Sequence, residues 1–154
     1  MKSNIIISTL VISSLVLASC NSKKSKTVST QQLTIAEPFD LTYSEGGGIT
    51  GIIESYHLES SGSIKHFKKL PSQQDTLIWT KEAPNDELAI LQQSLLSSTI
   101  LSESLNGKGN MTSRLIYATS DTSYSLSWAG VGAAGDVSPE LKSWLTRLKK
   151  LLQK

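Results

Sequence analysis

The sequence predicts an α+β fold: an antiparallel sheet of about five or six strands with two helices on one face. Three observations lead to this prediction. Short segments in which apolar and polar residues alternate fill much of residues 33–154. Turn residues separate these segments by only a few positions, as in hairpins. Leucines fall at helical spacing in two places, and the strands need those helices to cover their apolar face.

Four strands are expected before the first helix. They are residues 39–44, 52–58, 64–68 and 76–80. In the first of them, Phe39, Leu41 and Tyr43 alternate with polar residues, which is the pattern of a half-buried strand. In the fourth, Leu77 and Trp79 are two positions apart and are expected to share one face of the sheet. The N-terminal half of the domain is therefore expected to be a strand meander.

The first helix is expected to begin at residues 84–87, where acids and hydrogen-bond acceptors crowd a helix start. Leu88, Leu91 and Leu95 then mark one face, and the helix is expected to end around residues 97–99. The expected elements that follow are a loop at residues 106–110 and strands at residues 114–119 and 123–128.

The second helix is expected to close the chain. Ser138 suits the N-cap, and Pro139 and Glu140 suit the first turn. Its apolar residues at helical spacing are Leu141, Trp144, Leu145, Leu148, Leu151 and Leu152. Lysines and arginines lie between them, so a position on a lipid surface is an alternative. We favour packing on the sheet, because the strands need a cover.

The N-terminal segment is typical of an export signal. Lys2 precedes an apolar stretch at residues 5–18, which is short for a membrane span. Leu17-Ala18-Ser19-Cys20 resembles the lipobox of bacterial lipoproteins, which implies cleavage after residues 1–19 and diacylation of Cys20. An ordinary secretory signal is the alternative. Asn21 is not the aspartate associated with inner-membrane retention, so we expect a lipid anchor in the outer membrane if the organism is Gram-negative.

Residues 20–32 are polar and are expected to form a flexible tether from the lipidated cysteine to a single domain at residues 33–154. Lys23, Lys24 and Lys26 make the tether positive, as a solvated linker or as a contact to lipid headgroups. Removal of the signal leaves 14 basic and 13 acidic side chains. This balance argues against a nucleic-acid partner, because phosphate binding needs a clustered basic surface.

Few residues are available for catalysis or metal binding. Cys20 is the only cysteine, so acylation leaves no thiol for a disulfide, a metal or a reaction. His57 and His66 are expected to be exposed strand residues; a two-ligand metal site across their hairpin is the alternative. We predict no metal, no cofactor and no enzymatic activity. The rival hypothesis is a hydrolase that uses His57 with Glu54 or Glu59.

The run Gly46-Gly47-Gly48, with Gly51 close behind, is the most unusual local feature of the domain. A phosphate-binding loop would need a lysine and a hydroxyl partner, which are missing. A structural role, in a bulged hairpin or at a close approach of another backbone, is one interpretation. A flat loop that contacts a protein is the other.

The order of the expected elements, together with Glu45-Gly46-Gly47-Gly48-Ile49-Thr50-Gly51, resembles emfourin-type inhibitors of thermolysin-like metallopeptidases. It is also similar to small envelope lipoproteins of Bacteroidetes type. The resemblance spans residues 39–152, and the segment at residues 70–80 departs from it. It implies a domain that binds and blocks a peptidase.

Together these features predict a lipid-anchored protein of the cell envelope with a small non-catalytic binding domain. Its partners are expected to be membrane lipid, through acylated Cys20, and a protein, with a secreted peptidase as the candidate. The residues predicted to contact that protein are Glu45, Gly46, Gly47, Gly48 and Gly51.

Overall fold

Six strands form one antiparallel sheet in the computed structural model, which describes residues 33–153. The order across the sheet is β4-β3-β2-β1-β5-β6. The strands are β1 (Asp40–Gly47), β2 (Ile52–Glu59), β3 (Ser63–Lys69), β4 (Thr76–Glu82), β5 (Met111–Ala118) and β6 (Ser123–Ala129). The predicted signal segment, Cys20 and the tether lie outside the described residues.

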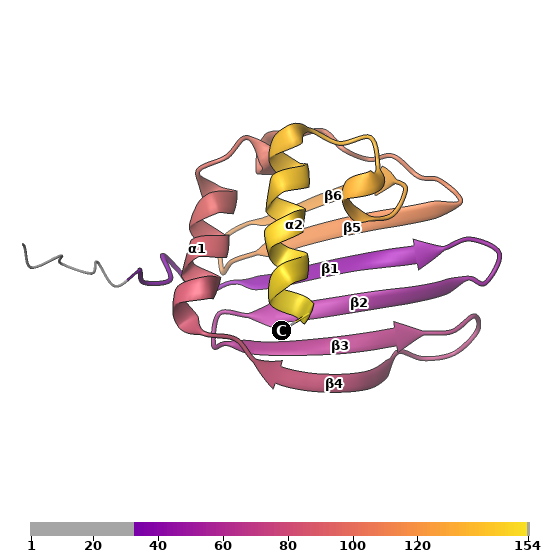
Figure 1. The fold of residues 1–154 in the computed structure, drawn as a ribbon, viewed down its shortest axis with the longest axis horizontal. Helices are drawn as coiled ribbons and strands as arrows, with labels where there is room; N and C mark the ends of the chain where they lie inside the picture. Colours follow the sequence, from indigo (N-terminus) through magenta and orange to yellow (C-terminus); the bar gives the residue numbers. More distant parts are fainter. Residues whose placement is uncertain (1–32, 154) are drawn as a thin grey trace, which may run out of the picture. The chain divides into compact units, whose positions relative to one another are not determined.

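Two helices, α1 (Asn85–Leu96) and α2 (Pro139–Gln153), lie against the same face of the sheet (Figure 1). Short 3-10 turns, η1 (Ile100–Ser102) and η2 (Gly132–Ala134), complete the described elements. This arrangement confirms the predicted α+β class. None of the helices within residues 33–153 is long and apolar enough to cross a bilayer.

The apolar stripe of α2 is buried against the sheet and α1. The buried residues of the stripe are Leu141, Trp144, Leu145, Leu148, Leu151 and Leu152. Each large apolar side chain buried in this way stabilises the fold by roughly 1.5–3 kcal/mol. The stripe therefore packs on the protein, as predicted, and is not available to a lipid surface.

Specific hydrogen bonds hold both ends of α2. At its start, Ser138 Oγ accepts the Leu141 backbone N–H at 3.1 Å, which confirms the predicted N-cap. At its end, the Lys81 ammonium donates to the carbonyls of Leu151 and Leu152 at 3.0 and 2.8 Å. Because Lys81 belongs to β4, this contact fastens the helix C-terminus to the edge of the sheet.

The two faces of the sheet differ in composition. The helix-covered face carries the core, including Leu41, Tyr43, Leu115, Leu126 and Trp128, all of which are buried. The opposite face, called the open face below, carries no described helix (Figure 1) and is rich in short polar side chains. Its central row consists of Ser55, Ser44, Arg114 and Ser127, which are cross-strand partners. One polar and one apolar face is the usual pattern of an antiparallel sheet.

The fourth strand departs from the prediction that Leu77 and Trp79 share a face. Trp79 pairs with His66, whereas Leu77 pairs with the next residue of β3, Phe67. Adjacent residues of a strand point to opposite faces, so the bulge at Ile78 reverses the alternation. Trp79 therefore packs against the core, and Leu77 is 53% exposed.

The sequence pattern suggested that the first strand ends before the glycine run, at residue 44. In the structure the strand continues into the run. β1 continues through Gly47, which pairs with Ile52 of β2 and Met111 of β5. Ladder hydrogen bonds are made by the backbone, so a glycine can extend a strand that has partners on both sides. For the same reason β5 begins at Met111, three residues before the predicted start.

Candidate functional site

The glycine-rich segment forms the tip of the β1–β2 hairpin. Residues 48–51 make the turn, which is closed by a hydrogen bond from the Gly51 N–H to the Gly48 carbonyl at 3.2 Å. Gly48 also donates to the Asn110 carbonyl at 2.6 Å, which ties the tip to the start of β5. The hairpin is therefore held by β5 as well as by its own two strands.

The glycines of this hairpin meet structural requirements. Gly48 and Gly51 have φ angles of 68° and 60°, in the left-handed region that favours glycine. At Gly46, a Cβ atom would lie 2.2 Å from the carbonyl oxygen of Ile52. A close approach of another backbone, one of the two structural explanations considered above, is thus what the structure shows.

Ile49 is the prominent side chain of the tip. It is fully exposed, between the turn residues Gly48 and Thr50. Pro71 of the β3–β4 loop lies beside the turn, and Ile53 and Leu70 nearby are 36% and 37% exposed. We call Ile49, Ile53, Leu70 and Pro71 the tip surface. An apolar residue within a glycine-rich turn is the sequence feature that could have identified this surface. The prediction named the glycines as contact residues and missed Ile49.

Glu45 does not belong to the tip surface. It lies in β1 on the helix-covered face, where its carboxylate accepts a hydrogen bond from the Tyr43 hydroxyl. The Lys149 ammonium of α2 contacts both oxygens of the same carboxylate, at 3.0 and 3.2 Å. The structure therefore separates Glu45 from the tip and makes it a link between the sheet and α2.

A row of aromatic rings crosses the helix-covered face beside Glu45. Tyr56 stacks on His66 with ring centroids 4.5 Å apart, and the tilted ring of Trp79 lies 5.1 Å from His66 and 6.1 Å from Tyr56. Burial raises the pKa of Tyr43, and the hydrogen bond to Glu45 raises it further. Burial, followed by the charge of Glu54, also raises the pKa of Tyr56. These phenols stay neutral well above neutral pH.

A cavity of about 250 Å³ lies where this row meets the end of α2. The residues that line it are Tyr43, Glu45, Tyr56, Trp79, Lys149, Leu152 and Gln153. Glu45 and Lys149 neutralise each other there, and Glu54, the cross-strand partner of Glu45, pairs with His66 at 3.2 Å. Sequence reasoning missed this cluster because the strand register that assembles it is not visible in the pattern.

The two histidines lie on opposite faces of the sheet. His57 pairs with Lys65 on the open face, and its ring meets Phe67 edge-on at 4.9 Å. His66 pairs with Tyr56 on the helix-covered face and is only 9% exposed, so the prediction of an exposed strand residue is wrong for it. The alternative interpretation, a metal site formed by both histidines, is therefore wrong as well. Within residues 33–153, no group of three or more potential ligands is arranged to hold a metal.

The geometry also bears on the rival hypothesis of a hydrolase that uses His57 with Glu54 or Glu59. Glu54 and His57 are three positions apart in β2, so their side chains leave opposite faces of the sheet. Glu59 shares the face of His57, but Lys65 contacts its carboxylate at 2.5 Å. The hydrogen bond from Lys65 lowers the pKa of Glu59, which keeps this carboxylate ionised and unsuited to act as a general acid.

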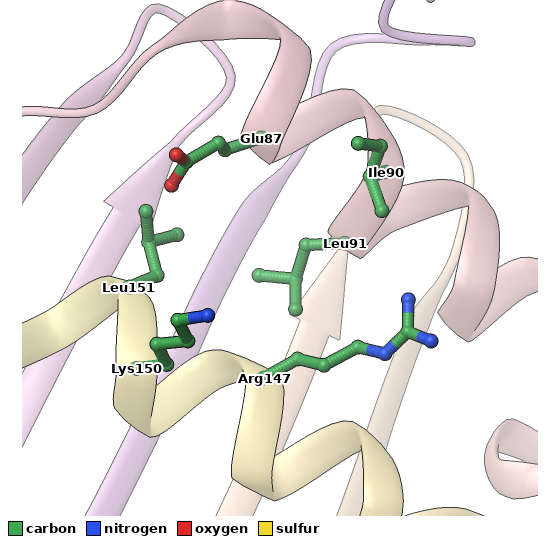
Figure 2. A pocket seen from close by; sticks show the side chains of 6 residues that line it. All are labelled: Glu87, Ile90, Leu91, Arg147, Lys150 and Leu151. Carbon is green, nitrogen blue, oxygen red and sulfur yellow. The ribbon is translucent and has the colours of Figure 1, made fainter.

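A further cavity of about 350 Å³ lies between the two helices (Figure 2). Leu91 and Leu151 lie at its base, and Arg147 and Lys150 extend along it from α2. Glu87 of α1 also lines it, so charges of both signs surround an apolar base.

Comparison with known proteins finds no family and no curated protein whose sequence matches this chain.

Proposed function

We propose that this protein is held at the cell envelope by an acylated Cys20 and binds a partner protein through the tip surface without catalysing a reaction. A secreted peptidase of the thermolysin-like class is the proposed partner. The lipid anchor and the outer-membrane location rest on the signal sequence, and the peptidase rests on the resemblance to emfourin-type inhibitors. The contact surface rests on the geometry of the hairpin.

The observation that carries the binding proposal is the complete exposure of Ile49. Burial of an exposed isoleucine side chain in an interface contributes roughly 1.5–3 kcal/mol of favourable binding free energy. Ile53, Leu70 and Pro71 are further exposed apolar residues of the hairpin and of the β3–β4 loop beside it, and Thr50 and Lys69 are polar residues of the same segments. An apolar centre with a polar rim is typical of protein-binding sites.

The support beneath the tip favours binding without rearrangement. β1 lies in the interior of the sheet, paired with β2 on one side and with β5 on the other. The hydrogen bonds from Gly48 to Asn110 and from Gly51 to Gly48 restrain the turn. A contact element that is already ordered loses little conformational entropy on binding.

The test uses the full acylated chain in a neutral detergent and measures its inhibition of several thermolysin-like peptidases. We expect Ile49→Ser to weaken inhibition by about tenfold or more, since the buried isoleucine contact is lost. Ile90→Ser is the matched control, because Ile90 is an exposed isoleucine on α1, in the helix layer. The control is expected to inhibit like the wild type.

Two results would count against the proposal. If the wild-type chain inhibits none of these peptidases, the peptidase is the wrong partner. If Ile49→Ser and Ile90→Ser inhibit equally well, the tip surface is not the contact. Circular dichroism of both variants should match the wild type, because exposed substitutions usually change stability by less than about 0.5 kcal/mol.

A further inference from the structure

A third cavity, with a distinct chemistry, lies at the β5–β6 end of the open face. Its volume is about 350 Å³. The residues that line it are Lys108, Gly109, Thr112, Arg114 and Ser127. Two of them carry positive charge and none carries negative charge.

The strand register places Arg114 among hydroxyl groups. Its cross-strand partners are Ser44 of β1 and Ser127 of β6. Arg114 is exposed, and its neighbours in β5, Ser113 and Leu115, are fully buried on the other face. The Arg114 side chain therefore projects from the open face between two serines. Because serine side chains are short, they leave room for a ligand beside the guanidinium.

The loop before β5 brings Lys108 to the same place. Ser127 donates its backbone N–H to the Leu105 carbonyl at 2.9 Å, and Asn106 bridges to Ser127. Gly109 donates to Thr112 Oγ1 at 3.2 Å, and the Thr112 hydroxyl donates back to the Gly109 carbonyl at 3.1 Å. These contacts fold residues 105–109 back along β6, so the loop forms a wall of the cavity.

The charges of the cavity are not neutralised within the described part of the chain. Neither Arg114 nor Lys108 forms an ion pair with another residue of 33–153, whereas Lys65, Lys68, Lys69 and Lys149 each do. An arginine fork and a lysine ammonium that share a cavity attract an oxyanion, because charge-assisted hydrogen bonds to oxyanions are strong. The Ser127 hydroxyl is a further donor.

We propose that this cavity binds the phosphate group of a phosphorylated ligand. A phosphate accepts hydrogen bonds from several directions, which suits donors from two strands and a loop. The cavity volume corresponds to roughly ten water molecules, so part of the organic moiety enters with the phosphate. The ligand is either a soluble phosphate ester or the headgroup of an anionic phospholipid in the membrane that carries the anchor.

The test uses the full acylated chain in bilayer discs of phosphatidylcholine and follows its amide resonances. Inorganic phosphate and glycerol 3-phosphate should shift the signals of Gly109, Arg114 and Ser127 in a saturable way. Arg114→Ala should weaken this binding about tenfold or more. Lys142→Ala is the matched control, since Lys142 is an exposed cation on α2 without an ion pair in residues 33–153, and it should bind like the wild type.

A second arm separates the two sources of phosphate. In discs that contain phosphatidylglycerol, a headgroup ligand shifts the same three signals before any phosphate is added, and Arg114→Ala abolishes that shift. If the shifts need added phosphate in both kinds of disc, the ligand is a soluble ester. The proposal is overturned if phosphate shifts no signal around the cavity, if Arg114→Ala and Lys142→Ala bind equally, or if acetate binds as tightly as phosphate.

Discussion

The polar groups of the helix-covered face are more often paired within the protein than those around Arg114 on the open face. On the helix-covered face, polar side chains are satisfied within the protein: Gln92 makes three hydrogen bonds, and Glu45 joins Tyr43 to Lys149. On the open face, Glu59 pairs with Lys65, but Arg114 forms no ion pair within residues 33–153, and at the tip Ile49 is fully exposed. The covered face contributes stability, and the exposed groups are the ones that we propose to bind other molecules.

One buried group on the covered face breaks this rule. His66 Nδ1 has no hydrogen-bond partner among the described residues, although its other ring nitrogen meets Glu54. An unpaired buried polar atom costs free energy, about 1–3 kcal/mol. The stacking of Tyr56 on His66 and the contact with the tilted Trp79 ring offset part of that cost.

Trp128 gives the largest expected effect on the covered face. Its indole N–H donates to the Gly132 carbonyl at 2.9 Å, and its ring packs on Gly135. We expect Trp128→Ala to lower the free energy of unfolding by about 3–5 kcal/mol, measured by urea denaturation. Tyr124→Ala, which removes a 37%-exposed ring from the same strand, should cost far less. If both variants lose the same free energy of unfolding, covered and exposed positions do not differ in their contribution to stability.

Gln92 tests the polar part of the covered face. Its side chain accepts from the Ala36 N–H at 2.8 Å and donates to the Glu37 carbonyl and the Tyr117 hydroxyl. Gln92→Ala leaves buried groups unpaired and should cost about 1–3 kcal/mol of stability. Gln93→Ala, at the next and exposed position, should leave the urea midpoint unchanged. A neutral Gln92→Ala would mean that water replaces the lost bonds.

The smallest expected effect is a change in how the stability of the protein depends on pH, and it involves Glu140. The backbone N–H and the hydroxyl of Thr99 donate to Glu140 at 3.1 and 2.9 Å, and these bonds lower the pKa of its carboxyl. A lowered pKa in the folded state stabilises the protein above the unfolded pKa, near 4.5, and this contribution is lost as the pH falls further. Unfolding of Glu140→Gln should therefore depend less on pH in the acid range. An unchanged acid slope of thermal stability would contradict this.

Local alternation predicted most of the fold. The period-two pattern of Tyr124, Leu126 and Trp128 located β6, and Ser138-Pro139-Glu140 located the start of α2. These elements could be predicted because their signals lie within a few residues of one another. The hydrophobic faces then required the helices to lie together on one side of the sheet.

What could not be predicted depends on register and on loop paths. The bulge at Ile78 turns Leu77 away from Trp79, and the pairing of β2 with β3 buries His66. A shift of one residue exchanges the faces of a strand, and the pattern does not reveal such a shift. Lys108 reaches the cavity of Arg114 only because its loop folds back along β6.

Photo-crosslinking from position 49 in the protein's own envelope tests the central proposal most directly. A photoreactive amino acid would replace Ile49 in the full chain, and a matched chain would carry it at Ile90. We predict that position 49 crosslinks one partner protein and that position 90 does not. If position 49 crosslinks no protein, or the same proteins as position 90, the tip surface is not the binding site.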